Sequence, residues 1–423
     1  MQGKEIVMLI QSSAQEIECF LPIVERIQNA KLSVVILSSI ADRSLMESSI
    51  FRLLSEEHNS NFIRIYVKVK YLTFLLKSLV KIAGKVLPKK KSRICIKYLE
   101  EAYDRIISRH IEANLNAASR RLFLAEIPFI KNSDYFSMIV QSLKGKLILL
   151  QAGDTISDIN HFSQSKSFLG NLDSRVIEKN DVVVAMNHFN QFRQGYFDGV
   201  IKSDSGSGSA TKKTSRGIKI AFLIAGFPSP SKENMAKVIQ RRNETSCEIV
   251  VFLRDSYMSR EDYKFSLGVL ADVMKETCGE MMWVLKPHPR QRFEDVANLF
   301  LGIANCTVTN ELSSSLLQKC NKVVTFWSGL SIKCFYYSVP CIEFFNHDSS
   351  KEFQMKAYQS VTATSIYKDM GIVFHASNKG ELIGFLRNRA LSQSLPSNEH
   401  TENLKHHNQQ YHKFLSMIDE FFT

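Results

Sequence analysis

The sequence predicts an α/β protein with two doubly wound domains, and three features support this. A chain of 423 residues rarely folds around a single hydrophobic core, so two domains are the expected number. Short apolar runs suited to buried strands alternate with stretches of helical spacing in both halves. Residues 202–216, rich in serine, glycine and lysine, have the composition of a flexible linker. We therefore predict domains at 1–201 and 217–423.

The composition is that of a globular protein with a basic surface. Apolar residues make up 44% of the chain and charged residues 23%. The net charge of +12 favours an anionic partner, such as acidic lipid or a phosphorylated substrate. The eight cysteines form no CxxC pair, so we expect reduced thiols in a cytoplasmic protein without a zinc site. The chain start lacks a signal-like apolar core, and no run reaches the ~18 apolar residues that cross a membrane.

The first domain opens with a strand–helix–strand pattern. Glu5–Gln11 and Leu32–Ser38 are apolar runs suited to parallel strands, and Ala14–Asn29 between them has helical spacing. Phe62–Val69 predicts a third strand, and a long helical pattern runs from Tyr98 to about Leu124. These elements indicate a Rossmann-like domain, although the GxGxxG of dinucleotide sites is missing.

Residues 68–97 form an insertion of a different kind, with ten basic residues and no acidic one. Lys77, Lys81 and Lys85 recur every four residues and share one helical face, beside many apolar residues. Such a helix can lie on an anionic membrane, so we predict peripheral association with the inner face of the cytoplasmic membrane. An ordinary surface helix is the alternative, and sparse aromatic residues argue against a nucleic-acid partner. The predicted membrane-surface residues are Lys77, Lys81, Lys85, Lys89, Lys90 and Lys91.

Two later loops of the first domain carry acid–base candidates. The strand predicted at Gly145–Leu150 is followed by Asp154, and the strand at Asp181–Met186 by His188. A carboxylate or imidazole at the carboxyl end of a strand is positioned for proton transfer. Capping of a turn or helix is the structural alternative for both residues.

The second domain repeats the strand–helix alternation more regularly, which predicts a parallel, doubly wound sheet. It opens with a strand at Ile218–Ala225 directly after the linker. The later predicted strands are Glu248–Leu253, Met281–Leu285, Thr307–Thr309, Lys322–Phe326 and Val339–Phe344. Helical patterns occupy Glu261–Thr277, Phe293–Ile303, Ser313–Cys320 and Ile332–Tyr337. The segments Gly380–Arg387 and Tyr411–Phe422 are closing helices, the last of which we expect to return to the first domain.

Two loops of the second domain are suited to phosphate. In Lys286-Pro287-His288-Pro289-Arg290 the prolines restrict the backbone, so Lys286, His288 and Arg290 are displayed beyond a strand. Ser328 and Gly329 open a short helix after another strand, and backbone amides there can bind an anion. Both loops are expected at the same edge of the sheet, so we predict a phosphate-binding site between them.

The motif at 286–290, followed about forty residues later by a strand, Ser328, a short helix and Val339-Pro340, resembles bacterial capsule-type glycosyltransferases. The resemblance covers residues 218–345 and implies a GT-B fold, in which two Rossmann-like domains face a cleft. It also implies that His288 and Ser328 hold the phosphate of a nucleotide-activated donor. The family includes transferases of Kdo and sialic acid from CMP-sugars, and related transferases that use CDP-glycerol.

Two positions depart from the family pattern. Lys333 stands where the serine helix commonly carries a glutamate that binds ribose hydroxyls, and lysine cannot accept a hydrogen bond. We therefore assign nucleotide contacts to Ser331 and Glu343. Ala152 precedes Gly153 where the glycerol-phosphate branch often has His-Gly, which favours an acidic-sugar transferase with Asp154, or else His188, as the base.

The resemblance thus implies a metal-independent glycosyltransferase without a cofactor. It would transfer an acidic sugar from a CMP-donor to a bacterial surface glycan or glycolipid, in capsule or lipopolysaccharide synthesis. Three alternatives remain: a CDP-glycerol-type polyol phosphate transferase, a nucleotide-sugar epimerase of the same fold, and a catalytically degenerate scaffold at the membrane surface.

Overall fold

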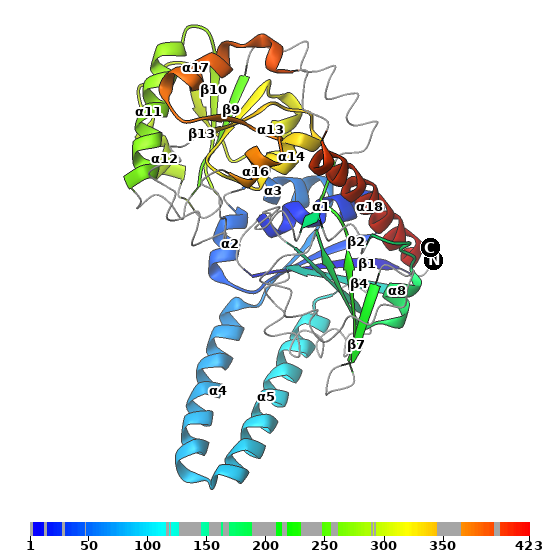
Figure 1. Ribbon diagram of the computed structural model, residues 1–423. Coiled ribbons are helices and arrows are strands. Elements are labelled where there is room, and N and C mark those ends of the chain that lie inside the picture. The colour runs from blue at the N-terminus through cyan, green and yellow to red at the C-terminus, as the bar shows by residue number, and fades with distance from the viewer. Residues whose placement is uncertain are drawn as a thin grey trace.

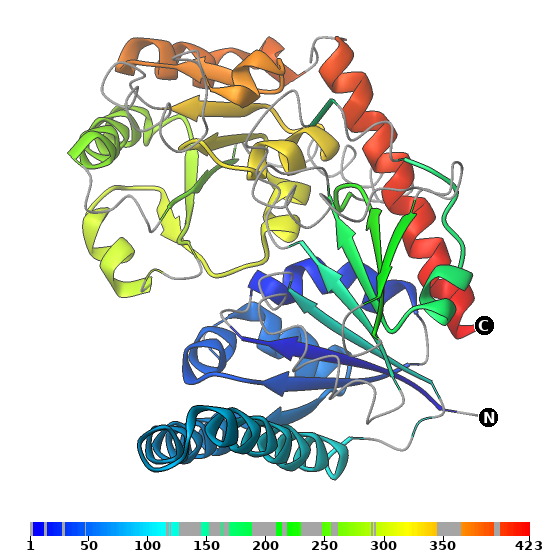
Figure 2. The same ribbon diagram turned by 60° about the horizontal axis from the view of Figure 1, so that its bottom comes forward.

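The protein contains two predominantly parallel β-sheets, each covered by helices on both faces, as the computed structural model shows (Figures 1 and 2). The structure describes residues 3–11, 15–27, 30–46, 48–115, 118, 120–126, 145–151, 162–163, 169–187, 209–213, 218–229, 248–254, 261–288, 291, 293–344, 365–392 and 398–423.

The first sheet has eight strands in its described part, in the order β3-β2-β1-β4-β5-β6-β8-β7. The strands are β1 (Lys4–Ile10), β2 (Lys31–Ile36), β3 (Asn61–Arg64), β4 (Arg120–Glu126), β5 (Lys146–Leu150), β6 (Val182–Met186), β7 (Ser209–Lys213) and β8 (Lys219–Ile224). The helices around them are α1 (Gln15–Arg26), α2 (Ser39–Met46), α3 (Ser49–Arg52), a π-helical turn (Leu53–Glu57) and α8 (Arg175–Lys179). The strands β1, β2, β4, β5, β6 and β8 are largely apolar runs because both faces of the sheet are buried there. The order of the first six is that of a Rossmann sheet.

The second sheet repeats this topology, in the order β11-β10-β9-β12-β13-β14. Its strands are β9 (Glu248–Phe252), β10 (Met282–Lys286), β11 (Cys306–Val308), β12 (Lys322–Thr325), β13 (Cys341–Phe344) and β14 (Phe374–Ala376). Its helices are α11 (Glu261–Thr277), α12 (Phe293–Leu299), α13 (Ser313–Lys319), α14 (Leu330–Tyr336), α16 (Ile366–Asp369), α17 (Lys379–Arg387) and a 3₁₀ turn (Arg389–Ser392). Side chains alternate between two cores along each strand: Trp283 and Leu285 lie on one face and Val284 on the other. Both sheets confirm the predicted class, two Rossmann-like α/β domains of the GT-B type.

The last helix, α18 (Glu399–Phe422), connects the two sheets. It begins at a capping box between Asn398 and Thr401. Leu404 near its start packs into a core of the second sheet, whereas Phe414 and Phe421 pack into the core of the first. The helix therefore passes from the second sheet to the first and ends near the chain start (Figure 1).

The predicted boundary between the domains does not coincide with the division between the sheets. β8 was expected to open the second domain, but it pairs with β6 in the first sheet. β7 lies inside the predicted linker at 202–216 and pairs antiparallel with β8. An edge strand needs backbone hydrogen bonds but no strongly apolar face, so composition alone did not reveal it. The sheets separate between β8 and β9.

The basic insertion forms a helical hairpin that projects from the first sheet (Figures 1 and 2). Its helices are α4 (Tyr66–Val86) and α5 (Lys89–Glu112), which pack side by side and are joined by Leu87 and Pro88. The predicted third strand is therefore only Asn61–Arg64, and the helix predicted to about Leu124 ends at Glu112. Leu122–Leu124 belong instead to β4, beside β1 at the centre of the sheet. In the described part of the chain, no helix is both long and apolar enough to span a membrane.

Candidate functional site

The two predicted phosphate-binding loops, which carry His288 and Ser328, follow strands that end at the same edge of the second sheet. β9 lies between β10 and β12, and all three strands run parallel. Their carboxyl ends therefore place His288, Arg254 and Ser328 along one edge, in that order. The strand order reverses between β9 and β12, and ligands of open α/β sheets bind at such a switch point.

A line of hydrogen bonds connects these strand ends. The His288 amide donates to Oε1 of Gln291 (2.7 Å), and Nε2 of Gln291 donates to the carbonyl of Arg254 (3.3 Å). Nη1 of Arg254 then donates to the carbonyl of Phe326 (3.2 Å), two residues before Ser328. Arg254 thus joins the two loops at the switch point. The only sign of this role in the sequence is that Arg254, a cation, directly follows the predicted strand Glu248–Leu253.

Lys286 lies at the end of β10 as a largely buried cation. Its Nζ donates to the carbonyl of Asn310 (3.3 Å) at the end of the neighbouring β11. Burial lowers the pKa of Lys286, and the carboxylates of Glu18 and Glu311 oppose this by raising it. A cation with so little water around it is stabilised by an anionic partner, which suits the predicted phosphate contact.

The Ser328 loop has a conformation that few residues adopt. Trp327, directly before it, has a φ of 52°, in the left-handed region that is costly for a bulky side chain. Oγ of Ser328 accepts a hydrogen bond from the amide of Leu330 (3.3 Å) at the start of α14. Gly329 is the N-cap residue of that helix. Because a hydroxyl can accept and donate together, Ser328 keeps the capacity to donate to a phosphate oxygen.

The two predicted nucleotide contacts are enclosed by protein. Ser331 and Glu343 have no exposed surface, and Oγ of Ser331 contacts Sγ of Cys341 (3.6 Å) inside the domain. Burial raises the pKa of Glu343 to about 8, although the nearby Ser365 side chain and the charge of Arg254 oppose the shift. A ribose contact at either side chain is not supported, because no ligand can reach a fully buried group without rearrangement.

Glu18 of α1 joins the first domain to this edge. Its Oε1 accepts from the Ser313 amide at the start of α13 (3.4 Å), and its Oε2 lies 3.9 Å from Nζ of Lys333. Lys333, the departure from the family pattern, therefore faces a carboxylate that comes from the other domain. The local sequence gives no sign of this contact, since a glutamate in the first turn of a helix is usually only a favourable charge there.

Asp154, His188 and Arg290 lie outside the described residues. The described segments that contain β5 and β6 end at Gln151 and Asn187. Both residues are buried, and the Asn187 amide donates a hydrogen bond to Oε1 of Gln151 (3.2 Å). Among the described residues, no three His, Cys, Asp or Glu side chains cluster as metal ligands, and the seven cysteines there are free thiols.

No family model matches the sequence, and no curated protein matches it either. Several solved structures align with nearly the whole chain. UDP-GlcNAc 2-epimerase from Neisseria meningitidis, bound to UDP-GlcNAc, is 9% identical, with 97% of this chain and 100% of that chain covered and a TM-score of 0.47. MurG from Acinetobacter baumannii is 10% identical (98% and 99% covered, TM-score 0.40). A UDP-forming α,α-trehalose-phosphate synthase from Burkholderia vietnamiensis is 8% identical (99% and 98% covered, TM-score 0.41). With TM-scores this low, the likeness establishes neither an activity nor a substrate for this chain.

Proposed function

We propose that the chain is a glycosyltransferase that uses a nucleotide-activated sugar and holds the donor phosphate at the carboxyl edge of the second sheet. One observation carries the proposal: Arg254 joins the His288 and Ser328 loops at the switch point of a Rossmann sheet. Lys286 adds a buried cation to the same edge.

The chemistry follows from these charges. When the bond to the sugar breaks, negative charge builds on the departing nucleotide phosphate, and preorganised cations and hydrogen-bond donors stabilise it. Lys286, Arg254, His288 and Ser328 supply such groups, and Arg290 and the Gly329 amide are further candidates. The proposed reaction needs no metal ion or cofactor. Asp154, or else His188, is the proposed base that accepts the proton of the acceptor hydroxyl.

The proposed donor is a CMP-activated acidic sugar, such as Kdo or sialic acid, and the acceptor a bacterial surface glycan or glycolipid. The resemblance at residues 286–290 supports this choice.

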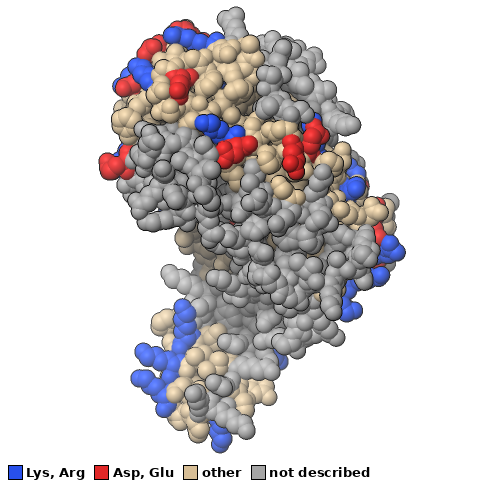
Figure 3. Space-filling view, viewed as in Figure 1, with Lys and Arg blue, Asp and Glu red and all other residues tan. Residues whose placement is uncertain are grey.

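We also propose peripheral association with the inner face of the cytoplasmic membrane. Lys77, Lys81 and Lys85 of α4 and Lys91 of α5 are exposed on the projecting hairpin, where basic side chains gather in the surface view (Figure 3). A cation close to an anionic membrane contributes about 1 kcal/mol to binding. The side chains of Lys89 and Lys90 lie outside the described part of the chain.

His288→Ala tests the donor site. We expect kcat to fall by about 10²-fold, the usual effect of removing a group that stabilises the leaving charge. Nucleotide affinity measured by calorimetry against CMP, CDP, UDP and GDP identifies the donor, with CMP expected to bind most tightly. Turnover is measured with EDTA present and is expected to persist, since the proposed reaction needs no metal ion. The control variant is His406→Ala, which replaces an exposed histidine of α18.

The outcomes separate the alternatives. Conversion of the donor sugar without any acceptor would identify an epimerase, and transfer from CDP-glycerol a polyol phosphate transferase. Absence of binding by all four nucleotides would indicate a scaffold. Unchanged turnover in His288→Ala would contradict the proposed phosphate site.

A further inference from the structure

The outer face of α4 carries a continuous row of exposed apolar side chains. Intervals of four, four, three and four residues separate them, so they lie on one face of the helix. The members, with their exposed fractions, are Tyr71 (65%), Leu75 (39%), Leu79 (46%), Ile82 (57%) and Val86 (74%). We call this row the apolar stripe. Single exposed apolar residues are ordinary, but a contiguous row marks a surface that binds something.

A row of lysines runs beside the apolar stripe. Lys77, Lys81 and Lys85 are exposed and repeat every four residues along the same helix. Between Tyr66 and Leu99 the sequence contains no acidic residue that could neutralise them. The outer face of α4 is therefore both apolar and uniformly positive.

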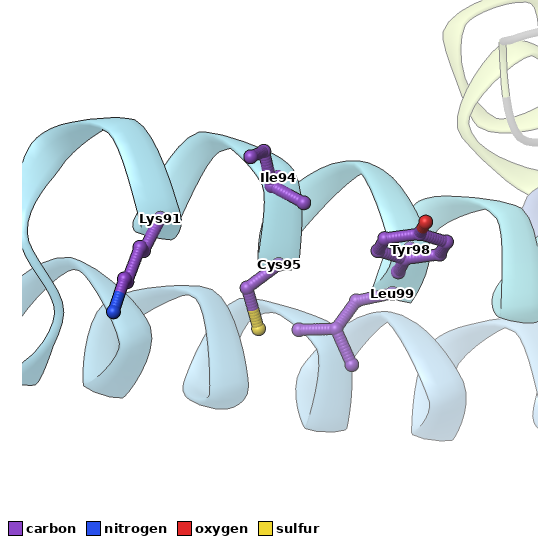
Figure 4. Close-up of a pocket in the computed structure, with 5 residues that line it drawn as sticks. All are labelled: Lys91, Ile94, Cys95, Tyr98 and Leu99. Atoms are coloured by element: carbon purple, nitrogen blue, oxygen red, sulfur yellow. The ribbon is translucent and has the colours of Figure 1, made fainter.

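The face of α4 next to the apolar stripe packs against α5, whereas the members of the stripe keep 39–74% of their surface exposed. Ala83 is buried there. A shallow, largely apolar cavity of about 410 Å³ lies along α5, lined by Lys91, Ile94, Cys95, Tyr98 and Leu99. Figure 4 shows Cys95 and Leu99 directed toward α4. Ile94 and Tyr98 are themselves exposed, which extends the apolar surface onto the second helix.

We infer that α4 lies in the interface of an anionic bilayer, with the apolar stripe inserted between lipid chains and the lysines among the headgroups. This inference rests on the proposed membrane association and adds that binding requires insertion. A face with one sign of charge beside aliphatic side chains matches a surface that is anionic outside and apolar beneath. A second copy of the chain would bring lysines against lysines, and a nucleic acid would leave the aliphatic side chains exposed.

The test compares a double variant, Leu79→Gln with Ile82→Gln, with the unaltered chain. Glutamine keeps the helix propensity and the lysines but removes apolar area. The probe is vesicles of phosphatidylethanolamine with about 30 mol% phosphatidylglycerol, in a co-sedimentation assay. We expect binding at least ~10-fold weaker in the variant. Part of the binding of the unaltered chain should persist in ~0.5 M NaCl, which screens charge but not apolar contact.

Phe265→Gln, at an exposed apolar residue of α11 on the second domain, is the matched control and should bind as the unaltered chain does. Circular dichroism verifies that the variants keep their helices. If the double variant binds vesicles as tightly as the unaltered chain and salt releases both completely, insertion is wrong and the association is purely electrostatic. No vesicle binding by the unaltered chain would overturn both, whereas nucleotide binding would be unaffected. A dimer in solution that the double variant abolishes would assign the apolar stripe to self-association instead.

Discussion

Glu18 places a negative charge beside the cations of the proposed donor site. Its carboxylate faces Lys333 at 3.9 Å and raises the pKa of Lys286, which burial alone lowers. Only about a tenth of its side chain is exposed, so water screens this charge less than on an open surface. Glu18 therefore competes with an incoming phosphate for both lysines.

Glu18→Gln should strengthen nucleotide binding at neutral pH by about fivefold, which corresponds to ~1 kcal/mol. Glutamine can still accept the hydrogen bond from Ser313, so the change removes mainly charge. The pKa of Lys286 should fall further without its anionic neighbour, so binding should be lost at a lower pH on the alkaline side. Calorimetry at several pH values measures both effects.

Glu261→Gln is the control for this variant, because it removes a carboxylate from the exposed pair with Lys264 on α11. Unchanged or weaker nucleotide binding by Glu18→Gln at neutral pH would show that Glu18 does not face the donor phosphate.

At the scale of elements, the packing of α18 against the segment after β8 holds the two domains together. Gly226 in that segment has a φ of 81°, and a methyl group at this position would overlap the carbonyl of His407 in α18. The ring of His407 stacks on Phe162 at 5.0 Å and meets Phe227 at 5.5 Å. The close approach of backbone to helix therefore depends on glycine.

Gly226→Ala should lower the free energy of unfolding by more than ~2 kcal/mol, since both the conformation and the contact are lost. Gly268→Ala is the matched control, because Gly268 lies inside α11 with open space around it. That change should stabilise the protein by about 0.5–1 kcal/mol, as alanine favours the helix. Urea unfolding of both variants measures the difference, and equal stabilities would contradict the assigned contact.

At the scale of the whole molecule, two buried groups make stability depend on pH with opposite signs. Burial raises the pKa of Glu343 to about 8, so its folded form retains a proton that the unfolded form loses above 4.5. Burial lowers the pKa of His407 to about 3, so its unfolded form binds a proton below 6.5 that the folded form does not. Because of Glu343, the free energy of unfolding decreases as pH rises from 4.5 to about 8. Because of His407, it decreases as pH drops from 6.5 to about 3.

Two variants should separate these contributions. The stability of Glu343→Gln relative to the unaltered chain should rise between pH 4.5 and 8, by at most about 1.4 kcal/mol per pH unit. The stability of His407→Phe relative to the unaltered chain should rise as pH decreases from 6.5 toward 3. Urea unfolding across this range measures both. A pH-independent difference for either variant would show that its side chain titrates normally in the folded protein.

Several elements were predictable because local sequence and final environment agree. The apolar runs of β1, β2, β9, β10 and β12 are buried on both faces, as their composition indicates. β4 was missed because its residues follow a long helical pattern, and pairing with β1 and β5 determines its state. β7 was missed because serine, threonine and lysine suit a linker as well as an edge strand.

The α/β class, the ends of the strands before His288 and Ser328, and the basic character of the insertion follow from local sequence, because each depends on neighbouring residues. Tertiary structure alone decided that Arg254 stands between those strand ends, that Glu18 faces Lys333, and that Ser331 and Glu343 are buried. These relationships join residues far apart in the chain, and local spacing contains no information about which strand lies beside which. The membership of β8 in the first sheet has the same origin, since strand pairing depends on the assembled sheet.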